Sequence, residues 1–416
     1  MAQVLVIGSG GREHAICKKF QKSPQVTTVY CAPGNPGMAL DGITQVPISE
    51  MAFDALIEFA QEQAIDLTFV GPEVPLSKGI VDAFQAAGLV IFGPKKASAQ
   101  LESSKSFAKD FMQRHDIPTA SSETFHDSVQ ALSFVVQQPT PIVIKVDGLA
   151  AGKGVAIAKT RTEAQNIIQA LYDRNPQQTV VIEDYLVGQE FSYMCFVNQD
   201  KIVPLPLSQD HKRLLDQDLG PNTGGMGAYS PLPQMPKDLA EQAYREIMQP
   251  TVAGLLEDGL NCSGVIYVGL VLTSAGLRVI EYNMRLGDPE TQILLPRLKS
   301  DFYTLIQTLL ANRQPEVTWQ TAAYTLGVVV AAEGYPKQPQ KGILIPDLTN
   351  DQGIQITYAG VTEKDHQLVS SGGRVLMLAT TQETIADCQK VLYDFIDQRI
   401  AAPLIYRHDI GAKALK

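Results

Sequence analysis

The sequence predicts a multidomain protein of α/β and α+β class that begins with a parallel, Rossmann-like α/β domain. Apolar runs typical of strands occur at 4–8, 66–72 and 89–94, and helical periodicity lies between them at 53–64 and 77–88. Such alternation indicates a parallel sheet with helical crossovers. Ligands of this architecture bind at the carboxyl ends of the strands, where the glycine-containing turns of this segment are expected.

The rest of the chain predicts further units. A helix is expected over 103–116, followed by strands joined by glycine turns from "PIVIKVDG" to "LRVIEYNMR". From about residue 322, the runs "YTLGVVVAA", "GIQITYAG" and "GRVLMLAT" precede a helix near 383–399, which is the pattern of a small antiparallel α+β domain. A chain of 416 residues is long enough for several cores, and we place boundaries near residues 102 and 321.

The composition favours a cytoplasmic protein that binds small molecules. A formal net charge of -10 argues against a protein that coats nucleic acid. No apolar stretch is long enough to cross a membrane, and the N-terminus lacks the basic leader of a signal peptide. The five cysteines are scattered without metal-type spacing, as expected for reduced thiols in cytosol.

The opening stretch "VLVIGSGGREHAI" departs in two ways from a dinucleotide-binding turn. Gly8 and Gly10 fit G-x-G-x-x-G, whereas Glu13 stands in the third glycine's place. No acidic residue ends the second strand, "VTTVYCAPGN", where NAD-binding proteins hold the ribose. The amides of Gly8, Gly10 and Gly11 at a helix N-terminus still suit a phosphate, with Arg12 adding charge. The alternative is a turn that serves only strand–helix packing.

The segment "KVDGLAAGKGV" predicts a glycine-rich hairpin. Gly148 and Gly152 are too close together for a Walker loop, and Gly154 replaces its Ser or Thr. Strands flank the segment, so it is either a hairpin that folds over a triphosphate with its amides and Lys153, or an ordinary exposed hairpin. Lys145 lies in the apolar strand before it and therefore needs an anion, either a structural carboxylate or a ligand phosphate.

The segment "LRVIEYNMRLGDPETQ" gives the strongest indication of a functional site in the sequence. Strand alternation places Glu281, Asn283 and Arg285 on one face. Two oxygen ligands beside a guanidinium suit a magnesium–phosphate assembly, because Mg²⁺ takes few protein oxygens and fills its octahedron with water and phosphate oxygens. Arg285 then neutralises charge on a transferred phosphoryl group. The alternative is a surface ion-pair face on an edge strand.

Two further segments carry weaker signals. In "VIEDYLVGQEFS", Glu183 and Tyr185 share a strand face, and with the backbone near Leu186 they suit an adenine site, leaving Glu190 for a ribose. The polar loop at 208–231 is long enough to be functional, and it crowds charges of both signs at its start. No G-x-S-x-G elbow accompanies it, which argues against a serine hydrolase.

Together these residues resemble the ATP-grasp ligases and, within them, the phosphoribosylamine–glycine ligase family. The motifs "GSGGREHA", "GPEVPL", "KVDGLAAGKGV", "SQDHKR", "GPNTGGMGAYSP" and "RLGDPETQ" carry the resemblance nearly from end to end. The last two are the most specific for this family. One departure concerns the wider superfamily, in which an acidic metal ligand usually precedes the E-x-N strand. Gly269 stands at the corresponding position here.

The resemblance implies that ATP drives the joining of glycine to 5-phosphoribosylamine through a glycyl phosphate, yielding glycinamide ribonucleotide, ADP and phosphate in purine biosynthesis. It implies a substrate domain at 1–102, an ATP-grasp domain at 103–321 with a mobile lid at about 120–190, and a C-terminal α+β domain at 322–416. We expect a monomer rather than an oligomer, with small-molecule substrates and neither nucleic acid nor membrane as a partner.

The resemblance also implies roles for single residues. ATP would be held by Lys105, Lys145, Gly148, Gly152, Lys153, Gly154, Glu183, Tyr185, Leu186 and Glu190. The ligands of Mg²⁺ (or Mn²⁺) would be Glu281 and Asn283. The catalytic residues would be Lys145, Asp210, Lys212 and Arg285. The two other substrates would meet Gly8, Gly10, Gly11, Arg12, Glu13, Asn222, Thr223, Gly224 and Asp288.

Three alternative functions fit the sequence less well. A neighbouring ATP-grasp enzyme acting on a different ribonucleotide is disfavoured by "RLGDPETQ" and "GPNTGGMGA". An NAD-dependent oxidoreductase is disfavoured by the missing acidic residue and the missing third glycine. A catalytically silent ATP sensor needs only nucleotide contacts, so it does not account for Glu281, Asn283, Lys145 and Arg285 together.

Overall fold

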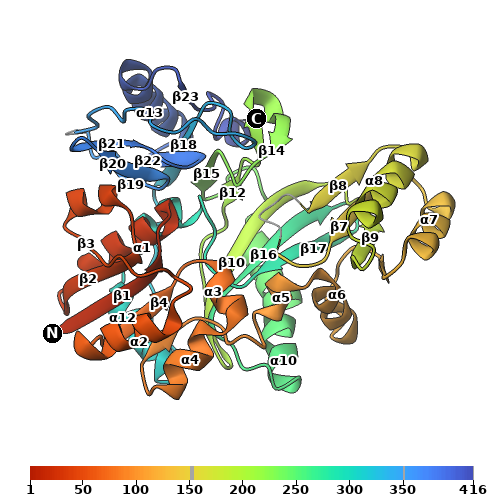
Figure 1. Ribbon diagram of the computed structural model, residues 1–416, viewed down its shortest axis with the longest axis horizontal. Helices are drawn as coiled ribbons and strands as arrows, with labels where there is room; N and C mark the ends of the chain where they lie inside the picture. The colour runs from red at the N-terminus through yellow and green to blue at the C-terminus, as the bar shows by residue number, and fades with distance from the viewer. Residues whose placement is uncertain (150–153, 350–351, 416) are drawn as a thin grey trace.

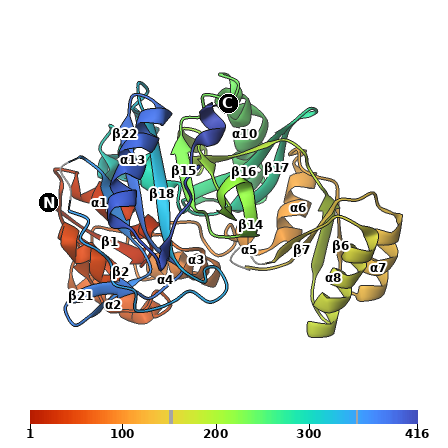
Figure 2. The same cartoon turned by 90° about the horizontal axis from the view of Figure 1, so that it is seen from above.

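The computed structural model describes residues 1–149, 154–349 and 352–415. Figure 1 and Figure 2 show lobes arranged around a central sheet. The N-terminal and C-terminal lobes lie against one another, and a small lobe within 120–190 projects at the opposite end of the molecule. No helix among the described residues is long and apolar enough to span a membrane.

The N-terminal lobe is the parallel α/β domain that the sequence predicts. It consists of β1 (Ala2–Gly8), α1 (Gly11–Gln21), β2 (Val26–Pro33), β3 (Thr44–Gln45), α2 (Phe53–Glu62), β4 (Leu67–Val70), α3 (Glu73–Lys78), α4 (Ile80–Ala86) and β5 (Ile91–Phe92). The five strands pair in parallel in the order β3-β2-β1-β4-β5. The glycine turn after β1 leads directly into α1, so the helix N-terminus lies at the carboxyl edge of the sheet.

The small lobe follows a pair of helices. The elements are α5 (Gln100–Ser103), α6 (Lys105–Arg114), β6 (Ser122–Phe125), α7 (Ser128–Gln137), β7 (Ile142–Val146), β8 (Val155–Ala158), α8 (Arg161–Arg174) and β9 (Val180–Asp184). The four strands form an antiparallel sheet in the order β6-β9-β7-β8. Ile142, Ile144 and Ile168 belong to a hydrophobic core of this lobe's own.

The helix predicted over 103–116 is α6, Lys105–Arg114, and Ser104 is its N-cap. This residue adopts an extended backbone conformation, and its hydroxyl accepts a hydrogen bond from the backbone N–H of Phe107, so α6 begins separately. The carboxylate of Asp147, just beyond β7, accepts a hydrogen bond of 2.5 Å from the backbone N–H of Lys105. The break therefore ties the N-terminus of α6 to the small lobe.

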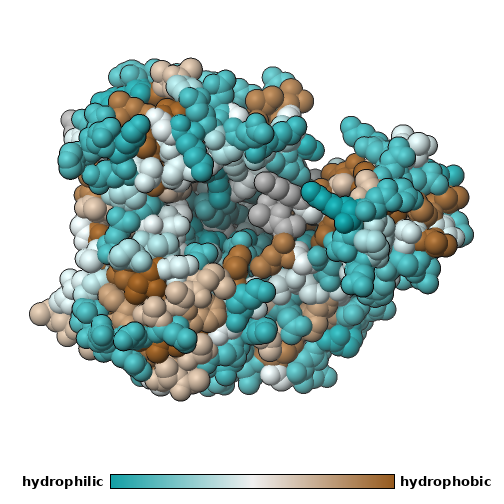
Figure 3. All heavy atoms as spheres, in the orientation of Figure 1, coloured by the Kyte–Doolittle hydropathy of each residue, from teal (hydrophilic) through white to brown (hydrophobic). Residues whose placement is uncertain are grey.

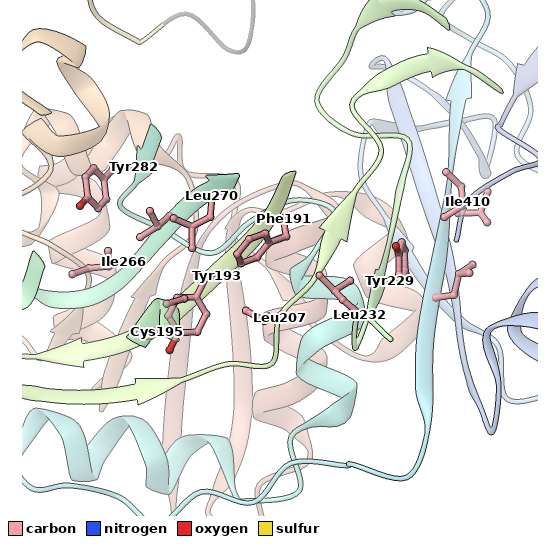
Figure 4. Close-up of a cluster of buried hydrophobic side chains, with 14 of the residues drawn as sticks. Phe191, Tyr193, Cys195, Leu207, Tyr229, Leu232, Ile266, Leu270, Tyr282 and Ile410 are labelled. Carbon is pink, nitrogen blue, oxygen red and sulfur yellow. The ribbon is translucent and has the colours of Figure 1, made fainter. Parts of the chain in front are cut away.

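A four-stranded sheet lies at the centre of the molecule, between the lobes (Figure 1). Its strands are β10 (Gln189–Asn198), β11 (Lys201–Pro204), β16 (Ser263–Thr273) and β17 (Gly276–Asn283), paired antiparallel in the order β11-β10-β16-β17. Figure 4 shows Phe191 and Tyr193 of β10 with Ile266 and Leu270 of β16 in the buried cluster. The associated helices are α9 (Leu239–Ala243), α10 (Gln249–Glu257), α11 (Thr291–Leu294) and α12 (Phe302–Leu310).

The C-terminal lobe is the antiparallel α+β unit that the sequence predicts. It contains β18 (Tyr324–Ala332), β19 (Gln355–Tyr358), β20 (Val361–Lys364), β21 (Gln367–Ser370), β22 (Arg374–Gln382), α13 (Ile385–Arg399) and β23 (Leu404–Ile405). Its sheet is extended by strands from the polar segment at 208–231, in the order β12-β15-β18-β22-β19. That segment contributes β12 (Gln209–Asp210), β13 (Arg213–Leu215), β14 (Leu219–Asn222) and β15 (Gly227–Ser230).

Candidate active site

A cleft of about 1440 Å³ lies where the lobes meet. Figure 3 shows a hollow on this face of the molecule with hydrophilic residues around it. Most predicted site residues line the cleft, namely Gly10, Arg12, Glu13, Lys105, Lys145, Gly148, Gly154, Glu183, Tyr185, Leu186, Glu190, Asp210, Lys212, Asn222, Thr223, Gly224, Glu281, Asn283, Arg285 and Asp288. Gly8 and Gly11 do not line it. Gly152 and Lys153 lie outside the described residues.

Glu281 and Asn283 lie at the end of β17 and line the cleft, as the strand alternation predicts. Burial by itself raises the pKa of Glu281. The surrounding cations, among which Lys212 and Lys145 act most strongly, nevertheless hold this pKa below its ordinary value. The carboxylate is therefore ionised at neutral pH and suited to bind a cation.

The strand beside β17 supplies no second carboxylate. Gly269 of β16 pairs directly with Glu281, and a Cβ on Gly269 would lie 3.3 Å from Glu281 Cγ. Within the described ranges, no group of three or more His, Cys, Asp or Glu is arranged to hold a metal. The donor set is therefore one carboxylate and the amide oxygen of Asn283. This set fits Mg²⁺, which retains water and phosphate oxygens as its other ligands.

Lys145 is buried at the cleft wall and forms an ion pair with Glu183 of β9. Its Nζ also donates a hydrogen bond of 3.0 Å to the carbonyl of Ile280. The other carboxylate oxygen of Glu183 lies 2.5 Å from Nζ of Lys109. A structural carboxylate is thus the partner that the buried Lys145 required, and one of its three N–H groups remains for a ligand.

Lys105 and Lys109 lie one helical turn apart on α6, and both line the cleft. The Nζ of Lys105 donates a hydrogen bond of 2.8 Å to the carbonyl of Gly148. Burial lowers the pKa of both lysines. The sequence reasoning missed Lys109, although its i,i+4 spacing from Lys105 was an available signal.

Arg285 connects the central sheet to the N-terminal lobe. Its guanidinium lies 3.1 Å from a carboxylate oxygen of Glu102 and 3.5 Å from one of Glu73. It also donates a hydrogen bond of 2.8 Å to Oδ1 of Asn283. Burial by itself lowers the pKa of Arg285, but the two carboxylates hold it above its ordinary value. The sequence reasoning missed both carboxylates because they come from distant helices.

A second group of charges surrounds Asp210. Burial raises the pKa of this carboxyl to about 7. The Asp210 carboxylate in turn raises the pKa of Lys212, whose Nζ lies 3.7 Å from a carboxylate oxygen of Glu190. Glu290 is buried nearby and accepts hydrogen bonds of 2.9 and 2.8 Å from the hydroxyls of Ser192 and Tyr267. It was missed, although it lies within the motif "RLGDPETQ".

The side chain of Glu13 occupies the glycine-rich turn that follows β1. Glu13 accepts a hydrogen bond of 2.7 Å from the backbone N–H of Gly10 and pairs with Arg12 at 2.5 Å. A Cβ on Gly8 would lie 2.6 Å from Glu13 Cγ, so this glycine makes room for the carboxylate. The third-glycine position of a dinucleotide fold thus holds an anion at the helix N-terminus. This anion opposes an NAD diphosphate there, and equally the phosphate that the sequence predicts on the amides of Gly8, Gly10 and Gly11.

The C-terminal lobe adds a cation to the cleft. Arg374 of β22 lies 3.0 Å from a carboxylate oxygen of Asp288 and donates a hydrogen bond of 2.6 Å to the carbonyl of Gly224. Burial by itself raises the pKa of Asp288, and Arg374 is the strongest of the cations that hold it below its ordinary value. Arg374 was missed because the run around it predicts only a strand.

The chain matches the sequence models of one family along most of its length. Those described as the N domain, the ATP-grasp (A) domain and the C domain of phosphoribosylglycinamide synthetase match residues 2–102, 103–291 and 325–413.

Curated relatives are similar over the whole chain. The phosphoribosylamine–glycine ligase of Lactococcus lactis is 50% identical, covering 99% of this chain and 100% of that protein. The protein of the same name from Listeria innocua is 48% identical, covering 99% of each.

Solved structures are also similar to this chain. A phosphoribosylamine–glycine ligase from Thermotoga maritima superposes with a TM-score of 0.85 at 33% identity, covering 98% of this chain and 100% of that one. A biotin carboxylase from Campylobacter jejuni shares the fold, with a TM-score of 0.74 at 12% identity over 97% of this chain and 92% of that one.

Proposed function

Since the chain belongs to the phosphoribosylglycinamide synthetase family, we propose that it joins glycine to 5-phosphoribosylamine with cleavage of ATP, giving glycinamide ribonucleotide in purine biosynthesis. The observation that carries this proposal is one cleft in which Lys145, Glu281 and Arg285 face the same space. Such a set holds the phosphates of a nucleotide and neutralises the charge of a transferred phosphoryl group.

The reaction proceeds in two displacements. A carboxylate oxygen of glycine attacks the γ-phosphorus of ATP, the bond to the β–γ bridging oxygen breaks, and ADP leaves. The amine nitrogen of 5-phosphoribosylamine then attacks the carbonyl carbon of glycyl phosphate, phosphate leaves, and the amine loses a proton. The protein aligns the reactants and excludes water from the acyl phosphate.

The nucleotide occupies the side of the cleft beside the small lobe. Lys105 and Lys145 hold its phosphates, Tyr185 and the Leu186 backbone line the adenine, and Glu190 meets the ribose. Glu281 and Asn283 would hold Mg²⁺, which would supply positive charge to the phosphate oxygens when bound. The lobe at about 120–190 acts as a lid, which its separate hydrophobic core supports.

Glycine binds between groups of opposite charge. Lys212 attracts its carboxylate, while Asp210 and Glu290 face its ammonium. The hydrogen-bond partners of Glu290 in the structure are hydroxyl groups, so its negative charge is available to a cation. An ammonium held there stays protonated and lacks the lone pair needed to attack the acyl phosphate.

The sugar-phosphate substrate binds across the N-terminal and C-terminal lobes. The opening turn contributes Arg12 and Glu13, and the opposite wall contributes the segment 222–224 and Asp288. These residues line one cleft within a single chain, which supports a monomer as the working unit. The described cysteines are free and buried, which supports a reducing compartment such as the cytoplasm.

The proposed reaction is tested by measuring ADP release with purified protein, MgATP, glycine and freshly generated 5-phosphoribosylamine. We expect ADP to form only when all three substrates are present, in equal amount to glycinamide ribonucleotide. ADP release that follows replacement of the amine by a different ribonucleotide, without a requirement for glycine, would assign the chain to a neighbouring ATP-grasp reaction.

The pH dependence tests the role of Asp210. Because burial raises its pKa to about 7, protonation below that pH removes the carboxylate that faces the ammonium. We expect kcat/KM for glycine to fall about tenfold per pH unit on the acid side of this pKa. The acid limb should disappear in Asp210→Asn, at a lower overall value, and persist in the exposed control Asp173→Asn. An acid limb retained in Asp210→Asn would contradict the assignment.

Removing Arg12 tests the sugar-phosphate end of the cleft. In Arg12→Ala we expect KM for 5-phosphoribosylamine to rise on the order of tenfold, the scale of one charge-assisted hydrogen bond, while KM for ATP changes little. Steady-state kinetics with each substrate varied in turn provide the comparison. Equal rises in both constants would show that Arg12 acts on the fold rather than on the sugar phosphate.

A further inference from the structure

Lys109 and Glu183 join two parts of the molecule. Lys109 lies on α6, whose residues Phe111 and Met112 belong to the core of the central region. Glu183 lies on β9 of the lid, and both charged side chains are buried. Their 2.5 Å ion pair therefore crosses the junction between body and lid in a place shielded from water.

The ammonium of Lys109 is surrounded by protein oxygens although the residue lines the cleft. Its Nζ contacts Glu183, donates a hydrogen bond of 2.9 Å to the hydroxyl of Thr119 and donates one of 3.2 Å to the carbonyl of Ala120. Two hydrogen bonds and one ion pair thus hold the ammonium on three sides. Lys109 is thus fixed in place and acts only through its neighbours.

Lys145, unlike Lys109, has an N–H group that is available to a ligand. Two of its N–H groups are used by Glu183 and the carbonyl of Ile280, which lies on β17 of the central sheet. The remaining N–H is the one that can point at a phosphate oxygen. The carboxylate that orients Lys145 is itself shared with Lys109, so the two ammonium groups and one carboxylate carry a single net positive charge.

We propose that Lys109 is a positioning residue for ATP. Through Glu183 it aims the free N–H of Lys145 at the nucleotide, and it offsets the carboxylate charge that would otherwise cancel that of Lys145. This inference rests on the proposed function, because it takes the ligand of Lys145 to be an ATP phosphate. Glu183 then serves the phosphate end of the nucleotide rather than its base.

A charge-restoring double variant tests the proposal. We expect Lys109→Met to weaken binding of MgATP about tenfold, because Glu183 then neutralises Lys145 alone. Glu183→Gln keeps one oxygen that can accept a hydrogen bond from Lys145 and removes one negative charge, so this variant should bind MgATP at least as tightly as the unmodified protein. The double variant regains a net positive charge and should recover most of the lost affinity. Titration calorimetry without glycine measures binding apart from turnover.

The controls separate this inference from a structural effect and from the proposed function. Lys159→Met, an exposed lysine of the lid, should leave binding unchanged. A double variant that binds no better than Lys109→Met would overturn the proposal. Should Lys109→Met fail to fold, Glu183→Gln and the double variant still decide, since weaker binding in both refutes it. Absence of MgATP binding by the unmodified protein would instead refute the proposed function.

Discussion

Glu281→Gln is expected to lower kcat on the order of 10³-fold while the protein stays folded. The carboxylate lies among the cations Lys105, Lys145 and Lys212, which hold its pKa low. In the proposed site it would bind Mg²⁺ together with Asn283. The amide keeps the shape of the side chain but carries no charge. Turnover at saturating ATP and glycine, measured over a range of Mg²⁺ concentrations, provides the test.

The matched control for this variant is Glu62→Gln at the exposed end of α2, which should change kcat by less than about twofold. If Glu281→Gln regains full activity at high Mg²⁺, the residue contributes to metal affinity but not to the chemical step. Near-normal activity at ordinary Mg²⁺ would remove Glu281 from the metal site, and with it the fit between the cleft and a magnesium–phosphate assembly.

Local patterns predict the elements of this fold because their causes are local. The apolar runs in 4–8 and 66–72 contain strands of a parallel sheet, β1 and β4, in which successive residues are buried on both faces. The break between α5 and α6 depends on Asp147, a residue more than forty positions away that caps α6 from the small lobe. No periodicity within 103–116 reports such a partner, so the predicted helix begins at residue 103 and not at Lys105.

The residues of the candidate site also divide into those that a local pattern indicates and those that depend on distant partners. Glu281, Asn283 and Lys145 were found because a polar side chain in an apolar strand is conspicuous in the sequence. Lys109 and Arg374 were missed because each lies in a pattern that a solvated charge explains equally well. Their significance comes from partners across the fold, Glu183 for the first and Asp288 for the second.

The structure gives a physical reason for the departure of the opening turn from the dinucleotide-binding motif. The sequence shows only that Glu13 replaces a glycine. The structure shows that its carboxylate accepts the amide of Gly10 and lies where a Cβ on Gly71 would be 2.1 Å away. A helix N-terminus that already holds an anion suits a ligand presenting hydroxyl groups, with Arg12 beside it for a phosphate.

Arg285→Lys is expected to lower kcat on the order of 10²-fold. The guanidinium contacts Glu102, Glu73 and Asn283 at once, and an ammonium keeps the charge but not the planar fork that spans them. Because the charge is retained, the buried carboxylates keep a cationic partner and the fold should persist. Rapid-quench measurement of the first turnover separates the chemical step from product release.

The control residue Arg278 lies on β17 and does not line the cleft, and Arg278→Lys should leave kcat within about twofold of the unmodified protein. Comparing the change in kcat with the change in KM for glycine in Arg285→Lys then shows which step Arg285 assists. A fall in kcat with little change in KM for glycine places its charge on the transferring phosphoryl group, where it acts in the transition state. A raised KM for glycine at unchanged kcat would instead mean that Arg285 binds the substrate carboxylate equally in both states, and its role in phosphoryl transfer would be lost.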